Sequence, residues 1–160
     1  MPPSSEPFKL QVLQALLAQL QAIAEGSTYF NTFVDSYVSF TNLAPPSASG
    51  YPAIFLAPMR TGYDNSRGRV VRTEEGEMRV QVTALDRTAS DVVETIERLI
   101  YDVKTAIHAD PTLGGLVIHT KIISDESLYP TVSDNPICGA DLVLQISYRA
   151  SRADLTSIAT

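Results

Sequence analysis

Histidine and carboxylate side chains are the groups in this chain that could support acid–base chemistry. There are two histidines, His108 and His119, and acidic side chains follow at Asp125, Glu126 and Asp134. A histidine works as a general base only beside a partner that orients it, and the sequence offers only distant partners such as Asp125. His108 falls at a predicted helix end, where the helix dipole favours its cation, and His119 falls within a predicted strand. Both positions favour structural histidines, with a small hydrolytic enzyme that uses His119 and an acidic partner as the alternative.

The sequence gives little support for a metal or covalent site. Asp125, Glu126 and Asp134 could hold a divalent ion in principle, but they lack the regular spacing of a calcium-binding loop. Cys138 is the single cysteine, which excludes an intramolecular disulfide and a cluster of thiolate ligands. Phosphate-binding, zinc-protease and serine-nucleophile motifs are missing from the sequence. We therefore expect no catalytic residue, no cofactor and no metal.

A group of arginines is the most distinctive local feature. Five of the chain's twelve basic residues fall in one polar stretch: Arg60, Arg67, Arg69, Arg72 and Arg79. Glutamates follow at once, so the charges could simply pair within a solvated loop. The functional interpretation is a docking arm that binds an acidic surface of a neighbouring subunit or DNA passing nearby. Aromatic residues do not alternate with these arginines, which disfavours stacking on single-stranded nucleic acid and favours a protein interface.

Acidic residues complete the set of candidate contacts. The candidate interface residues for a subunit or partner are Arg60, Arg67, Arg69, Arg72, Glu74, Glu75, Asp125, Glu126 and Asp134. They lie in two polar stretches, 60–77 and 125–136, and recognition is commonly carried by such connecting segments.

Composition limits the class of protein. At 160 residues with 44% hydrophobic and 19% charged residues, the chain has the size and balance of one folded domain. Its net charge of −6 disfavours binding nucleic acid through the whole surface. The sequence has no apolar run near the ~20 residues of a membrane span, and its start does not resemble a signal peptide. We expect a protein with no membrane contact.

The first half of the chain predicts one helix and one buried strand. An apolar stripe at helical spacing predicts an amphipathic helix over residues 7–25. Residues 28–43 favour an extended segment or a bent hairpin. The run 53–57 has no alternation, which predicts a strand buried on both faces and stopped by Pro58. Residues 60–77 predict a loop or a loose hairpin.

The second half predicts strands that surround a long helix. Alternating apolar residues predict a half-buried strand at 78–84 and another at 138–149, with a further strand at 116–123. A polar connection is expected at 125–136.

The helix between these strands has clear start and stop signals. The pattern Thr88-x-x-Asp91 predicts its capped start, and Pro111 with two glycines predicts its end. Charges four residues apart, Glu94 with Arg98 and Arg98 with Asp102, are expected on its solvent face.

Together these elements predict an α+β fold. We expect a single domain over residues 1–150, in which the N-terminal helix and the long helix pack on one face of a mixed or antiparallel β-sheet. Residues 151–160 are expected to form a flexible C-terminal tail.

The order of these elements and several short motifs resemble the tail-terminator, or tail-completion, proteins of long-tailed bacteriophages. The resemblance covers about residues 8–150. It rests most on Tyr51-Pro52-Ala53 at the start of a strand and on Asp110-Pro111-Thr112-Leu113-Gly114-Gly115 at the helix end. The leucine-rich first helix and the final strand ending Gln145-Ile146-Ser147-Tyr148-Arg149 match as well.

The resemblance implies a structural virion protein of the tail and neck. In that family a homohexameric ring caps the finished tail tube, stops polymerisation of the tube protein and offers a surface to the head-side connector. The implied partners are other copies of the chain, the tube protein and the connector, with passing contact to DNA in the lumen. No cofactor or catalysis is implied. Another neck or baseplate protein with the same small fold is the nearest alternative.

Overall fold

The structure is a computed structural model of the chain, and it describes residues 7–38, 50–63, 73–87, 91–130 and 136–151. Two helices and five strands make up this part of the chain. The helices are α1 (Phe8–Gln21) and α2 (Val92–Ala109). The strands are β1 (Asp35–Val38), β2 (Ala53–Tyr63), β3 (Thr73–Arg87), β4 (His119–Leu128) and β5 (Ile137–Ser151).

The strands form one mixed sheet in the order β1-β2-β3-β5-β4. β1 runs parallel to β2, and the other neighbours are antiparallel. β4 forms one edge of the sheet. At the other edge β1 pairs only with Ala53–Leu56 of β2, so the second half of β2 has no outer strand among the described residues.

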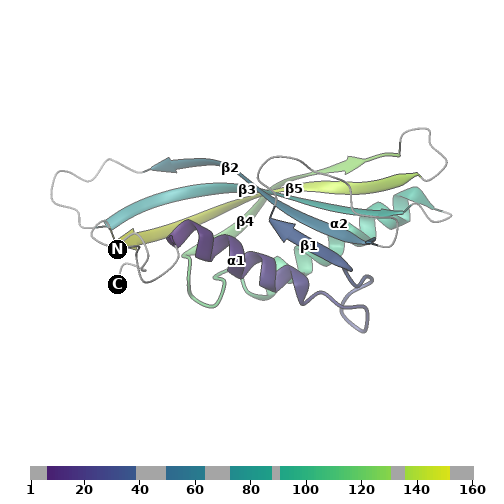
Figure 1. Cartoon of the computed structure of the whole chain (residues 1–160), viewed down its shortest axis with the longest axis horizontal. Coiled ribbons are helices and arrows are strands. Elements are labelled where there is room, and N and C mark those ends of the chain that lie inside the picture. Colours follow the sequence, from purple (N-terminus) through teal and green to yellow (C-terminus); the bar gives the residue numbers. More distant parts are fainter. Residues whose placement is uncertain (1–6, 39–49, 64–72, 88–90, 131–135, 152–160) are drawn as a thin grey trace.

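Both helices lie on the same face of the sheet (Figure 1). The core lies between these layers because β3 and β5 alternate strictly and turn their apolar side chains toward the helices. The buried hydrophobic residues of β3 are Met78, Val80, Val82 and Ala84, and those of β5 are Cys138, Ala140, Leu142, Leu144, Ile146, Tyr148 and Ala150. The predicted α+β domain with helices on one face of a mixed sheet is therefore confirmed.

The buried strand at 53–57 was predicted correctly at its start but not at its end. Ala53 to Leu56 are all buried, as two-sided burial requires. β2 nevertheless continues through Pro58 to Tyr63. The register between β2 and β3 shifts between Pro58 and Thr61, and proline is tolerated at such bulges and along sheet edges.

Residues 60–77, predicted as a loop or a loose hairpin, contain the facing ends of two paired strands. Residues 60–63 belong to β2 and residues 73–77 belong to β3, and β2 and β3 pair antiparallel there, as in the hairpin alternative. Residues 73–77 also pair with the end of β5, and their polar composition reflects the packing of only one face of the sheet. Residues 125–128 likewise extend β4 instead of starting a polar connection, after a register shift between Ile122 and Ser124.

The helices differ from the predictions at a few positions. α1 ends at Gln21, earlier than predicted, while Glu94 and Arg98 form the expected ion pair on α2. Asp91 caps α2 by accepting a hydrogen bond from the Glu94 backbone N–H, at 3.0 Å. Thr88 lies outside the described residues. After α2, Leu113, Gly114 and Gly115 all have positive φ, which explains the two glycines in this turn.

Candidate assembly surface

The structure places the described members of the predicted interface on three different strands of the sheet. Arg60 lies on β2, Glu74 and Glu75 lie on β3, and Asp125 and Glu126 lie on β4. The remaining candidates, Arg67, Arg69, Arg72 and Asp134, fall outside the described residues.

The two acidic residues of β3 bind within their own chain. Glu75 forms an ion pair with Arg149 of β5, with a nitrogen–oxygen distance of 2.6 Å. Glu74 accepts a hydrogen bond of 3.1 Å from the hydroxyl of Tyr148. Burial, together with the nearby Glu74 carboxylate, raises the pKa of Tyr148 well above its ordinary value, so this hydroxyl stays a donor. Both glutamates thus help to join β3 to β5, and each already has a partner within its own chain.

The two acidic residues of β4 point to opposite faces of the sheet. Asp125 forms an ion pair of 2.6 Å with Lys104 of α2, on the helix-bearing face. Glu126 lies directly opposite Asp141 of β5, on the other face, and it is exposed. Like charges in such a cross-strand pair are unfavourable unless a cation lies near them. Glu126 has no ion-pair partner among the residues that the structure describes.

Exposed apolar side chains lie at both edges of the sheet. On β2, Met59 is 56% exposed and stands beside the exposed Arg60. At and near β4, Ile118 is 55% and Ile123 is 42% exposed. We call Met59 and Arg60 the β2 margin, and Ile118, Ile123 and Glu126 the β4 margin.

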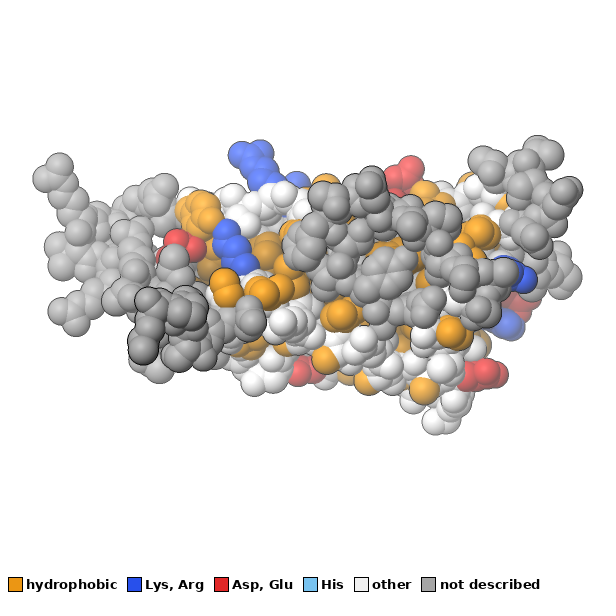
Figure 2. Space-filling model, in the orientation of Figure 1, with side chains coloured by type: hydrophobic (Ala, Val, Ile, Leu, Met, Phe, Trp, Pro, Cys, Tyr) orange, Lys and Arg blue, Asp and Glu red, His pale blue; other side chains and the backbone are white. Residues whose placement is uncertain are grey.

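The face drawn in Figure 2 has the same mixed character. Hydrophobic side chains reach the surface at several places there, with Lys, Arg, Asp and Glu side chains around them. Contacts with other proteins commonly use such apolar side chains as anchors, with polar groups around them.

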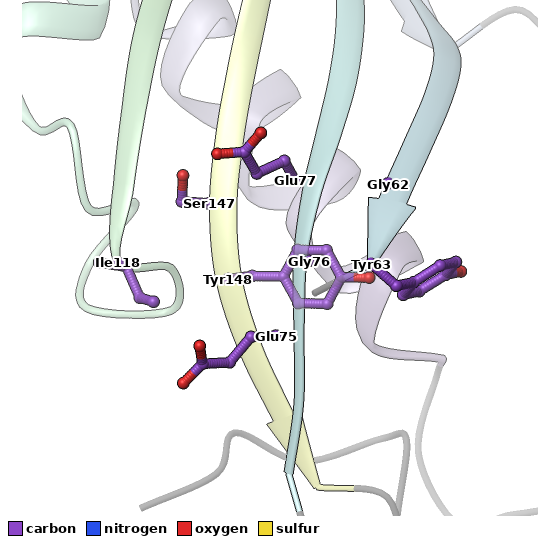
Figure 3. Close-up of a pocket in the computed structure, with 8 residues that line it drawn as sticks. All are labelled: Gly62, Tyr63, Glu75, Gly76, Glu77, Ile118, Ser147 and Tyr148. Atoms are coloured by element: carbon purple, nitrogen blue, oxygen red, sulfur yellow. The ribbon is translucent and has the colours of Figure 1, made fainter. Parts of the chain in front are cut away.

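An open hollow of about 350 Å³ lies near the end of the β3–β5 pair. Glu75, Glu77 and Ser147 line it from the sheet face that carries no helix, and Ile118 forms part of its wall (Figure 3). In the same view Tyr148 extends from β5 across β3 toward Tyr63.

His119 lies next to this hollow, and its cross-strand neighbours follow from the strand register. It faces Ser147 across β4 and β5, and Ser147 faces Glu77 across β5 and β3. The serine therefore separates the imidazole from the carboxylate by two strand spacings, roughly 10 Å. Within the described residues no carboxylate lies at ion-pair distance from His119. In the row from His119 through Ser147 to Glu77, the imidazole therefore has no direct contact with the carboxylate of the kind that orients a histidine base.

Metal ligands do not gather elsewhere in the described ranges. These residues contain no group of three or more His, Cys, Asp or Glu side chains that could hold a metal ion. The cysteine, Cys138, is buried. Among the same residues, neither helix is both long and apolar enough to cross a membrane.

Asp102 of α2 is the polar residue that the sequence analysis misplaced. It was expected on the solvent face beside Arg98, but it is fully buried. Its carboxylate accepts hydrogen bonds from the backbone N–H groups of Phe30 and Asn31, each at 2.9 Å, and from the Asn31 side chain at 2.8 Å. The buried charge thus holds the segment before β1 against α2.

The chain was also compared with known proteins. A scan against protein families finds no match for it, and a search of curated proteins finds none either.

Proposed function

We propose that this chain is an assembly protein that forms a ring by contact between the β2 margin of one copy and the β4 margin of the next. The observation that carries the proposal is the position of the β2 margin and the β4 margin at opposite edges of one sheet. Each margin combines exposed apolar surface with a charged side chain, and the two differ in composition. A surface that binds a different surface on the next copy gives a head-to-tail contact, and such contacts close into rings when the rotation permits.

The charges of the two margins are complementary. The β2 margin contributes the cation of Arg60, whereas the β4 margin contributes the carboxylate of Glu126. In a head-to-tail contact these groups would lie on facing surfaces. A charge pair at the rim of an interface contributes modestly to affinity, but it sets register and excludes wrong pairings.

The apolar side chains supply the larger part of the attraction. Complete burial of a side chain such as Met59, Ile118 or Ile123 contributes roughly 1.5–3 kcal/mol. Backbone N–H and C=O groups along the outer side of β4 offer further hydrogen-bonding capacity. The same edge carries charges and a bulge, which limit uncontrolled strand pairing.

We further propose that this ring is the tail terminator of a long-tailed phage. The support is the resemblance of the strand entry at Tyr51-Pro52-Ala53 and of the turn that follows α2, together with the α+β fold. On this proposal the ring is a hexamer in the virion that caps the tail tube, stops its growth and receives the head-side connector. It needs no cofactor and performs no reaction.

Electron microscopy of tail tubes tests this function. Tubes from the phage or prophage that encodes the chain would be mixed with the purified protein and imaged, with untreated tubes as control. We expect a ring of added density at one end of each tube, and tubes that no longer lengthen when tube protein is supplied. Rings found only at the baseplate end, or tubes that continue to grow, would contradict the terminator assignment.

A further inference from the structure

Two aromatic rings lie together on the exposed surface of α2. Phe30, which precedes β1, and Tyr101 of α2 pack edge to face, with their centroids 5.3 Å apart. Each side chain is 49% exposed, whereas phenylalanine is among the residues most often found buried. The guanidinium of Arg98 lies over the Phe30 ring, 5.2 Å from its centroid. We call Phe30, Tyr101 and Arg98 the aromatic patch.

A buried carboxylate holds the backbone that carries this patch. Asp102, the residue after Tyr101, is fully buried. It accepts hydrogen bonds of 2.9 Å from the backbone N–H groups of Phe30 and Asn31. Removing a charge from water is costly, and these hydrogen bonds offset that cost only while residues 30 and 31 stay in place. The Phe30 ring is therefore presented from an ordered backbone, so a partner that binds it loses little free energy in ordering the surface.

The aromatic patch offers a surface of the kind that other proteins bind. Aromatic residues and arginine are enriched among the residues that contribute most to the binding energy at protein interfaces. Two rings with about half of their surface exposed provide apolar area that a partner can cover. None of the patch residues belongs to the β2 margin or to the β4 margin, so this surface is separate from the proposed ring contact.

The charges around the patch indicate which partner fits it. Arg98 forms an ion pair with Glu94, and Lys104 forms one with Asp125 of β4. Glu97 lies one helical turn before the tyrosine of the patch, and its side chain is exposed. It has no ion-pair partner among the residues that the structure describes. A carboxylate beside apolar rings is complementary to a cation that stands next to an apolar side chain.

We propose that the aromatic patch binds a basic segment of a second protein. An aliphatic side chain of that segment covers the rings of Phe30 and Tyr101, and a lysine or arginine beside it pairs with Glu97. A second copy of this chain fits less well through the same surface, because a two-fold contact would bring the carboxylates around both patches together. The proposal does not depend on ring formation.

Selection of peptides on the full chain tests the proposal. A library of random short peptides is selected on the immobilised protein, and the binding of enriched peptides is measured by fluorescence polarisation. We expect these peptides to carry lysine or arginine next to leucine, isoleucine or valine. Phe30→Ala or Tyr101→Ala should weaken their binding by roughly tenfold or more, the effect of losing a central anchor. Glu97→Gln should weaken it by about two- to fivefold, as expected for an exposed ion pair.

Met59→Ala is the matched control. It removes an exposed apolar side chain from the β2 margin and leaves the aromatic patch intact, so its peptide binding should equal that of the wild type. Three results would overturn the proposal. They are no enrichment over an uncoated surface, enriched peptides without basic residues, and equal binding of the enriched peptides by Phe30→Ala, Tyr101→Ala and the control.

Amide chemical shifts of the unaltered protein give a second test, which does not depend on how well a variant folds. Addition of an enriched peptide should shift the amide signals of Phe30, Glu97 and Tyr101 and leave those of Met59 and Arg60 unchanged. Shifts confined to the two margins would overturn the proposal. Sedimentation of the protein without peptide tests a second copy as the occupant: a dimer that Tyr101→Ala abolishes would assign the patch to self-association and would likewise overturn the proposal.

Discussion

The ring of Tyr148 on β5 lies across the backbone of Gly76, its cross-strand partner on β3. A Cβ atom at residue 76 would stand 2.7 Å from the Tyr148 hydroxyl oxygen and 2.8 Å from the adjacent ring carbon. Glycine is therefore needed here for close approach, since an aromatic side chain covers the position where a side chain would otherwise stand. The contact holds the phenol within reach of Glu74.

The first prediction follows from this contact. Gly76→Ala should force the Tyr148 ring to move and should lower the free energy of unfolding by about 1–3 kcal/mol. Gly62→Ala is the matched control on the neighbouring strand, because a Cβ there meets no atom within 4 Å. Urea denaturation of both variants measures the difference. Equal stabilities would show that the ring is not held against Gly76.

Asp102 gives the second prediction. Asp102→Ala removes the acceptor for two backbone N–H groups, those of Phe30 and Asn31. A hydrogen bond to a charged group contributes about 1.5–3 kcal/mol, so the free energy of unfolding should fall by at least about 2 kcal/mol. Faster hydrogen exchange at these two amides should accompany the loss. Arg98→Ala, which breaks an exposed pair with Glu94, should cost less than about 1 kcal/mol.

The core assignment gives a third prediction. Leu144 and Ile100 are 0% and 5% exposed, and replacement of either by alanine should cost about 2–5 kcal/mol. Ile123→Ala, on the exposed edge strand, should leave unfolding within about 0.5 kcal/mol of the wild type. Thermal and chemical denaturation check all three. Unchanged unfolding of Leu144→Ala or Ile100→Ala would contradict the packing faces described above.

The turn after α2 gives a prediction about pH. Hydrogen bonds from the Thr112 hydroxyl and the Gly114 N–H lower the pKa of Asp110 below its ordinary value of 3.8. An acid with a depressed pKa in the folded state stabilises the fold above its unfolded pKa, and this contribution disappears as the pH falls through the folded pKa.

Asp110→Ala should therefore reduce stability at neutral pH and reduce it less in strong acid. Unfolding midpoints of the variant and the wild type, measured from about pH 6 down to pH 2, should converge at the acid end. Burial raises the pKa of Asp86, so Asp86 contributes a pH dependence of stability opposite in sign to that of Asp110. This contribution is the same in the variant and the wild type, so the difference between the two proteins reports Asp110. A gap between the two proteins that stays constant with pH would contradict the role of the Asp110 charge.

Much of the fold could be predicted from sequence because its packed faces have regular periods. β5 alternates along most of its length, and each apolar residue predicted to face the core from Cys138 to Tyr148 is buried. The strand ends at 60–63 and 73–77 were predicted only as one of two alternatives, a loop or a loose hairpin, because their pairing depends on strand register, which composition does not report. Asp102 was missed because its hydrogen-bond donors lie about seventy residues earlier in the chain.

The sequence could name residues of the candidate surface, but it could not show where in the fold they lie. Arg60 and Glu126 were both named from their charge and their polar surroundings. Their placement at opposite edges depends on the insertion of β5 between β3 and β4, a long-range pairing that the residue pattern does not encode. His119 likewise could be excluded from contact with Glu77 only once the strand order was known.

The central claim is that the two margins of the sheet bind each other between copies. Its most direct test is charge reversal with rescue, using Arg60→Glu and Glu126→Arg, whose thermal unfolding should match the wild type because both side chains are exposed. Capping of tail-tube ends, counted by electron microscopy, is the measurement. Each variant alone should cap far fewer ends than the wild type, and an equal mixture should recover capping because unlike charges meet at every contact of a ring in which the two variants alternate. Full capping by either single variant, or a mixture no better than its components, would contradict a contact between these margins.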